Sequence, residues 1–119
     1  MLIPERYSEI LRSAGRSLQD IGVAGVGLSR QHALDAVASL KGTQVAISGG
    51  DVLRLRDGRP RYSGDNWYVQ RLAGEDLAAY VSRTHEKADT YIRNYQDAED
   101  GSVLYVIVIS ELGLQKSFS

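Results

Sequence analysis

One stretch of the chain decides the fold: residues 49–68, which read GGDVLRLRDGRPRYSGDNWY. It holds four of the eleven arginines and the only tryptophan. Within it, Asp57-Gly58 is a strong signal for a two-residue β-hairpin turn. The residues just before that pair alternate leucine and arginine, which is typical of a half-buried strand. The stretch therefore predicts a β-hairpin.

The turn also fixes which residues face one another across the hairpin. Counting outward from it gives four facing pairs: Arg56 with Arg59, Leu55 with Pro60, Arg54 with Arg61, and Leu53 with Tyr62. The four arginines then share one face, where opposed like charges cost roughly a few tenths of a kcal/mol. This face needs anions. A partner can supply them, because arginine binds carboxylate and phosphate bidentately, or the chain itself can. The nearby carboxylates are Asp51, Asp57, Asp65 and the acidic loop of Asp97, Glu99 and Asp100.

The second strand of the hairpin has features of an exposed edge. Pro60 lacks an amide hydrogen, which favours an edge strand within reach of a partner. Farther along, Asp65-Asn66 favours a turn, while Trp67 and Tyr68 bring the rigid aromatic area found at interface hot spots. Because neighbours on a strand point to opposite faces, the two rings cannot share one core. Trp67 is equally suited to be a core anchor.

The flanking sequence supplies helices and further strands. Apolar residues at helical spacing predict helices over residues 4–14, 29–40 and 77–95. Short strands are expected over 45–47, 52–56, 67–72 and 103–109, the last at the centre of the sheet because it is apolar on both faces. Glycine-rich residues 21–27 predict a loop, and residues 63–66 predict a turn. Residues 1–119 thus form a single α+β domain, with a small antiparallel sheet of about four strands packed against three helices.

Composition narrows the classes of function. A net charge of −1 argues against a protein that coats nucleic acid or anionic membrane, and no apolar run is long enough to span a bilayer. The chain has no cysteine and only two histidines, so the sequence indicates no thiolate or histidine-rich metal site and no cofactor. No catalytic motif surrounds a serine or a carboxylate pair, so we expect no catalytic residue. The amino terminus does not resemble a signal peptide, which favours the cytoplasm.

The order of these features resembles the immunity protein 40 family of bacterial polymorphic toxin systems. The resemblance rests on Ile47-x-Gly49-Gly50-Asp51-Val52 and on Asp65-Asn66-Trp67-Tyr68, and runs from the first helix to the last strand. The chain departs from the family pattern at Gly64, where an aromatic residue is expected. The resemblance implies a non-enzymatic inhibitor that binds the carboxy-terminal domain of a toxin.

The candidate site follows from the hairpin and the two motifs. The residues expected to contact the partner are Asp51, Arg54, Arg56, Arg59, Arg61, Asp65, Trp67 and Tyr68. Gly49, Gly50 and Asn66 are expected to shape the backbone. Two alternatives stay open: the arginines grip the phosphate of a small ligand or nucleotide whose base stacks on Trp67, or Asp51 and Asp65 hold a metal for hydrolysis. An exposed edge also permits a weak homodimer.

Overall fold

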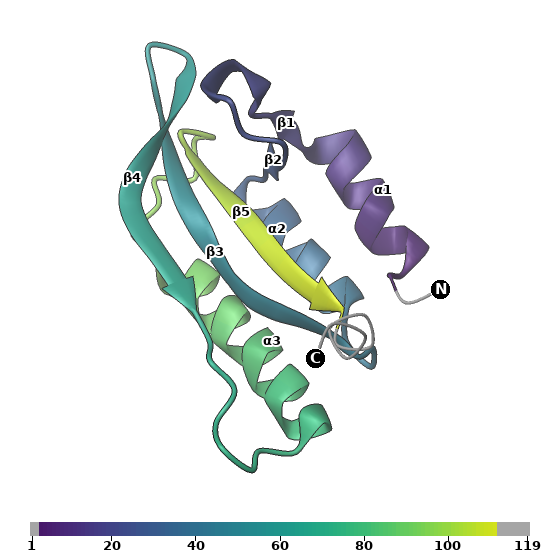
Figure 1. Ribbon diagram of the computed structural model, residues 1–119. Coiled ribbons are helices and arrows are strands. Elements are labelled where there is room, and N and C mark those ends of the chain that lie inside the picture. The colour runs from purple at the N-terminus through teal and green to yellow at the C-terminus, as the bar shows by residue number, and fades with distance from the viewer. Residues whose placement is uncertain (1–2, 112–119) are drawn as a thin grey trace.

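The computed structural model describes residues 3–111, in which three helices pack against an antiparallel sheet (Figure 1). The helices are α1 (Glu5–Ala14), α2 (Arg30–Ser39) and α3 (Leu77–Asn94). The sheet has the strand order β4-β3-β5 and consists of β3 (Val45–Arg56), β4 (Arg59–Tyr68) and β5 (Val103–Glu111). A small second sheet pairs β1 (Arg16–Ser17) with β2 (Val26–Gly27), on either side of the 3-10 helix η1 (Gln19–Ile21). The expected α+β fold is confirmed.

The three helices lie within one residue of their predicted ends. α3 starts after Asp76, whose carboxylate accepts a hydrogen bond from the Ala79 amide at 3.3 Å and so satisfies one free donor of the first turn. α1 follows Pro4 and ends before Gly15. One side of α3 is buried, through Tyr80, Val81, Thr84, Ala88 and Ile92. The apolar residues that recur with a 3.6-residue period in the sequence form this buried side of the helix.

The main core lies between the sheet and the helices. α2 and α3 lie behind the sheet in Figure 1, and α1 packs against α2. Val52, Trp67 and Tyr105 reach into this core from the three strands. On the opposite face, Leu18 packs against Leu53 and Leu104 near the hairpin end of the sheet. No helix covers the rest of that face in Figure 1. None of the described helices is long and apolar enough to cross a membrane.

Several strand predictions need correction. The strands expected over residues 45–47 and 52–56 are one continuous strand, β3, and the strand expected over residues 67–72 is the end of β4, which stops at Tyr68. β3 is the central strand, and β5 is apolar on both faces because Tyr105 faces the helices while Leu104 faces Leu18. β4 continues from the hairpin to Tyr68, so the predicted turn over residues 63–66 is a bulge within one strand, with Gly64 at a φ of 91°. The predicted loop over residues 21–27 ends in β2.

Candidate functional site

The tip of the hairpin has the geometry that its sequence predicts. Asp57 and Gly58 both have positive φ, 53° and 77°, as a two-residue turn of this kind requires. All four predicted pairs are present in the register of β3 and β4. The tip lies at the top of Figure 1, beyond the end of α3, where the central strand β3 turns into the edge strand β4. The arginines are therefore held on two paired strands and not on a loose loop.

All four arginines are exposed and share the face of the sheet that the helices cover farther down. Within residues 3–111, only Arg54 has a side-chain partner there, the tyrosine that follows α3. Its guanidinium lies 5.5 Å from the ring centroid of Tyr95 and donates to the Tyr95 hydroxyl at 3.1 Å. That hydroxyl donates in turn to Asp65 at 2.6 Å. Arg54 and Asp65 therefore join the hairpin to the end of α3.

The carboxylates of the chain do not neutralise the other three. Among the described residues, Arg56, Arg59 and Arg61 make no ion pair within 4.0 Å. The acidic loop lies against the start of α2 instead, where Arg30 is 3.8 Å from Asp97 and 3.6 Å from Glu99. Of the two sources of anions that the sequence left open, the internal one is not used within residues 3–111.

Asp97 is occupied on its other side as well. It accepts a hydrogen bond from the hydroxyl of Tyr105 at 2.9 Å, and Arg30 also donates to the carbonyl of Tyr95. Burial and then this bond to Asp97 raise the pKa of Tyr105, which keeps the phenol protonated. These contacts attach the loop after α3 to α2 and β5. They hold the acidic loop away from the arginines.

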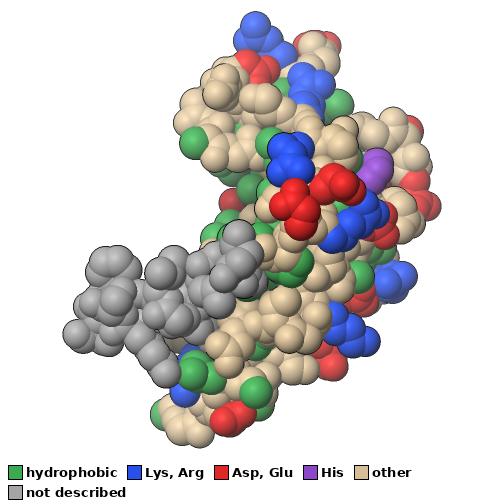
Figure 2. Space-filling view, turned by 90° about the vertical axis from the view of Figure 1, so that its right-hand side faces the viewer, with side chains coloured by type: hydrophobic (Ala, Val, Ile, Leu, Met, Phe, Trp, Pro, Cys, Tyr) green, Lys and Arg blue, Asp and Glu red, His purple; other side chains and the backbone are tan. Residues whose placement is uncertain are grey.

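Some basic side chains elsewhere on the surface have acidic neighbours, whereas Arg16, Arg71, Lys41 and Lys87 make no ion pair within residues 3–111. On the side shown in Figure 2, which carries α1, basic and acidic side chains lie next to one another. Within α1, Arg6 is 2.7 Å from Glu9 and Arg12 is 3.1 Å from Glu5. The hairpin tip therefore differs from α1 in charge balance.

Trp67 is a core residue. It is 6% exposed, and its ring stacks on Tyr91 of α3 at 4.7 Å between centroids. A Cβ on Gly50 would lie 2.3 Å from this ring, so glycine is required beneath it. A buried ring stacked on tyrosine offers no free face to a nucleotide base, which removes the stacking element of the phosphate-ligand alternative.

The remaining predicted residues lie on the other face of the sheet. Gly49 faces Tyr68 and Asp51 faces Asn66, on the side opposite to Trp67. Tyr68 is 74% exposed. Asp51 and Asp65 are thus on opposite faces and do not converge, and no cluster of three potential metal ligands occurs within residues 3–111. The sheet divides the candidate residues into two surfaces.

Sequence reasoning missed a shallow depression beside the arginine face. It measures about 350 Å³ and is lined by Lys87, Thr90, Tyr91, Asn94, Tyr95 and Gln96. Tyr95 belongs both to this depression and to the contact with Arg54, so the two surfaces are continuous. The helical spacing of Tyr91 and Tyr95 was the available signal, but such spacing usually marks the core.

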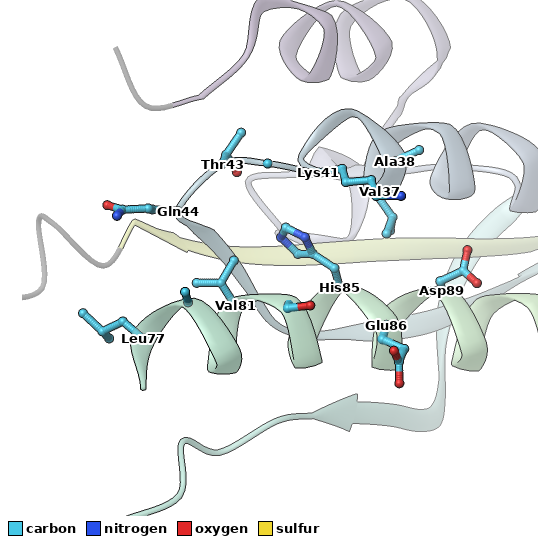
Figure 3. A pocket seen from close by; sticks show the side chains of 13 residues that line it. Val37, Ala38, Lys41, Thr43, Gln44, Leu77, Val81, His85, Glu86 and Asp89 are labelled. Atoms are coloured by element: carbon cyan, nitrogen blue, oxygen red, sulfur yellow. The ribbon is translucent and has the colours of Figure 1, made fainter. Parts of the chain in front are cut away.

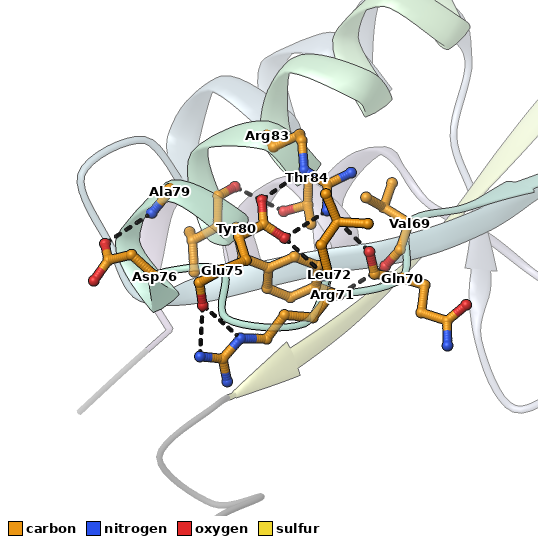
Figure 4. Close-up of polar contacts among 11 residues, drawn as sticks. Val69, Gln70, Arg71, Leu72, Glu75, Asp76, Ala79, Tyr80, Arg83 and Thr84 are labelled. Carbon is orange, nitrogen blue, oxygen red and sulfur yellow. Dashed lines mark hydrogen bonds and ion pairs between the residues drawn. The ribbon is translucent and has the colours of Figure 1, made fainter.

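A network of arginine and glutamate fixes the loop between β4 and α3 (Figure 4). Arg83 donates two hydrogen bonds to Glu75, each 2.7 Å long, and Arg71 donates to the Glu75 carbonyl. Hydrogen bonds from Arg83 and then from the Leu72 amide lower the pKa of Glu75 from 4.5 to about 2. These contacts hold the end of β4 against α3.

A cavity of about 750 Å³ lies between α2 and α3 (Figure 3). Val37, Leu77 and Val81 form apolar parts of its wall, and Lys41, Glu86 and Asp89 also line it. His85 donates from Nε2 to the Val45 carbonyl at 2.7 Å, because a carbonyl can only accept. No predicted site residue lines this cavity.

Comparison with known proteins gives one match. Residues 17–109 match the sequence model of the family described as Immunity protein 40, which confirms the resemblance seen in the two motifs. No curated protein and no solved structure matches the chain.

Proposed function

The chain belongs to the Immunity protein 40 family, and from this premise we propose that it binds and neutralises a cognate toxin domain without catalysing a reaction. It acts in the cytoplasm of the cell that makes the toxin, or of a neighbour of the same strain. The observation that carries the proposal is the arginine tip, defined as Arg56, Arg59 and Arg61. Its three guanidinium groups are exposed, share one face and make no ion pair within the described part of the chain.

The arginine tip suits an acidic patch on the toxin. Arg56 and Arg59 face each other, so their mutual repulsion is relieved when carboxylates of a partner come between them. The paired strands already hold the side chains at fixed spacing, which lowers the entropy lost on binding. Concentrated positive charge also speeds association with a negatively charged partner. Arg54 and the depression at Tyr95 extend the same surface towards α3.

The test compares two triple variants with the same change in net charge. One carries Arg56→Gln, Arg59→Gln and Arg61→Gln, and leaves Arg54 in its contact with Tyr95. The control carries Arg6→Gln, Arg12→Gln and Arg93→Gln, three exposed arginines that pair within their own helices. Binding is measured by calorimetry with the purified cognate toxin domain, and protection is measured in cells that express that toxin.

We expect the tip variant to bind on the order of 100-fold more weakly and to lose protection, while the control stays within a few fold of the original chain. Circular dichroism confirms that both variants are folded. A folded tip variant that binds and protects as well as the control would exclude the arginine tip as the interface.

A further inference from the structure

The shallow depression on α3, next to the hairpin, has a surface that is mostly apolar. Lys87, Tyr91 and Asn94 are four and three residues apart, so they lie along one side of the last turns of the helix. Tyr95, which follows the helix, forms the end of the depression that reaches the hairpin, where it contacts Arg54. We call this feature the tyrosine depression.

Both tyrosine rings of the depression are held in place by contacts within the chain. The ring of Tyr91 stacks on Trp67, with 4.7 Å between centroids. Tyr95 packs edge-on against Tyr105 with 5.9 Å between centroids, and its hydroxyl donates to Asp65. Aromatic side chains that are already fixed lose little conformational entropy when a partner binds, and tyrosine is common at interface hot spots. The depression is thus a preformed apolar contact area.

Basic groups lie at both ends of the tyrosine depression. Lys87 is roughly 12 Å along the helix axis from Tyr95, because a helix rises 1.5 Å per residue. It is exposed and makes no ion pair within residues 3–111. Arg54 lies at the other end, with the arginine tip beyond it. The described lining residues include no carboxylate. A partner that covers the depression therefore meets positive charge on both sides of an apolar area.

We propose that the tyrosine depression accepts a large apolar side chain of the toxin, with carboxylates of the toxin on either side of it, an inference that rests on the proposed function. The apolar side chain packs against the rings of Tyr91 and Tyr95 and removes them from water. One carboxylate pairs with Lys87, and the other pairs with the arginines of the hairpin. The acidic patch that suits the arginine tip thereby continues along α3 and has an apolar centre.

A second copy of the chain is a poor match for this surface. In a symmetric dimer the same surface lies on both sides of the interface. Two tyrosine depressions that faced each other would bring Lys87 and the hairpin arginines of one copy close to those of the other, and like charges across an interface oppose association. The charge therefore favours a different, acidic protein.

The test measures binding of the cognate toxin domain to two single variants of the full chain. Thr90→Glu places a negative charge in the depression, and Ser82→Glu is its control, because both residues are exposed on α3 and Ser82 lies outside the depression. Lys87→Gln removes the cation at the end away from the hairpin. Lys41→Gln is its control, because Lys41 is also exposed and also makes no ion pair within residues 3–111.

We expect both variants to bind more weakly than their controls, by at least about tenfold for Thr90→Glu and by about threefold for Lys87→Gln. The salt dependence of binding should decrease for Lys87→Gln, because one ion pair is lost. The heat-capacity change of binding should become less negative for Thr90→Glu, because less apolar surface is buried. Circular dichroism and thermal unfolding check that all four variants are folded.

The outcomes separate this inference from the proposed function. The inference requires both losses of affinity, so a loss at Thr90 or at Lys87 alone overturns it. If both variants bind as tightly as their controls while the arginine-tip variant is weakened, the tyrosine depression is not part of the interface and the proposed function stands. If the original chain does not bind the toxin domain, both fail. In analytical ultracentrifugation, a dimer of the original chain that Thr90→Glu converts to monomer would assign the depression to self-association and overturn the inference.

Discussion

The two ends of the β3–β4 hairpin are built from the same strands but differ in almost every physical property. At the root, around Gly50 and Trp67, the tryptophan ring is stacked on Tyr91 and the glycine leaves room for it. At the tip, the arginines are exposed, and the two strands pair only with each other beyond Leu55, whose amide donates to the Ser102 carbonyl at 2.8 Å. Arg16 of β1 also donates to the Gly58 carbonyl at 2.7 Å. The root is fixed by packing, while the tip is left with unsatisfied charge. This difference agrees with our proposal that the tip serves recognition, while the packing at the root serves stability.

Arginine also occurs beside the root, where it has a structural role. Arg83 and Arg71 are both bonded to Glu75, which closes the loop between β4 and α3. The chain thus provides a carboxylate for Arg83 and a backbone carbonyl for Arg71, two arginines that hold the fold together. At the tip it provides no carboxylate within the described residues, although Asp57 is adjacent in sequence. The contrast in pairing, more than the number of arginines, points to an external partner.

The largest expected effect is at the root. Gly50→Ala places a Cβ 2.3 Å from the Trp67 ring and 2.4 Å from the Val106 carbonyl oxygen, so the sheet or α3 must shift. We expect a loss of about 3 kcal/mol in the free energy of unfolding, measured by urea denaturation. Gly25→Ala is the matched control, because a Cβ there meets nothing within 4 Å, and it should change stability by less than about 1 kcal/mol. Equal effects of the two substitutions would contradict the packing at the root.

A smaller effect is expected at the loop that follows the root. The pKa of Glu75 is lowered from 4.5 to about 2 in the folded chain, so its contacts add stability that is complete above pH 4.5 and lost as pH falls towards 2. Glu75→Gln should lower the thermal midpoint at pH 7 and make that midpoint less sensitive to pH between 4.5 and 2. The two proteins should converge near pH 2. Parallel pH profiles in scanning calorimetry would show that Glu75 is not the group that titrates.

The tip could be predicted from sequence in detail, and the root could not. A two-residue turn determines the pairing of every residue up to the next irregularity, so Asp57-Gly58 was enough to give the register. Beyond Tyr62 the bulge adds residues to β4, and Ser63-Gly64-Asp65-Asn66 has the composition of a turn, so β4 was expected to end there. Local sequence does not distinguish a bulge from a turn when both favour glycine at positive φ.

Which candidate residues lie on which face of the sheet also depends on contacts between residues that are far apart in the sequence. The ring that Trp67 stacks on lies 24 residues later, on α3, and nothing near Trp67 identifies it. Likewise, the sequence allowed the acidic loop to pair with the arginine tip, and only the structure shows that the loop pairs with Arg30 instead. Alternation along a strand showed that Trp67 and Tyr68 face opposite ways, but only the packing of α3 shows which face is buried. Residue type and spacing therefore indicated the candidate residues, and tertiary packing determined which face of the sheet each of them occupies.

The smallest expected effect is at the tip and has the opposite sign. Arg59→Glu replaces two opposed like charges by an opposed pair of unlike charges, because residue 59 faces Arg56 across the hairpin. We expect stability to rise by roughly 0.2–1 kcal/mol at low salt, with Arg59→Gln between the two proteins, and the gain to shrink at high salt because the pair is exposed. The same Arg59→Glu substitution should weaken binding of the toxin domain, since it removes a cation from the arginine tip. A variant that is more stable yet binds less tightly would show that charge repulsion at the tip is retained for recognition. A loss of stability would instead mean that Arg59 has a stabilising anion within the chain.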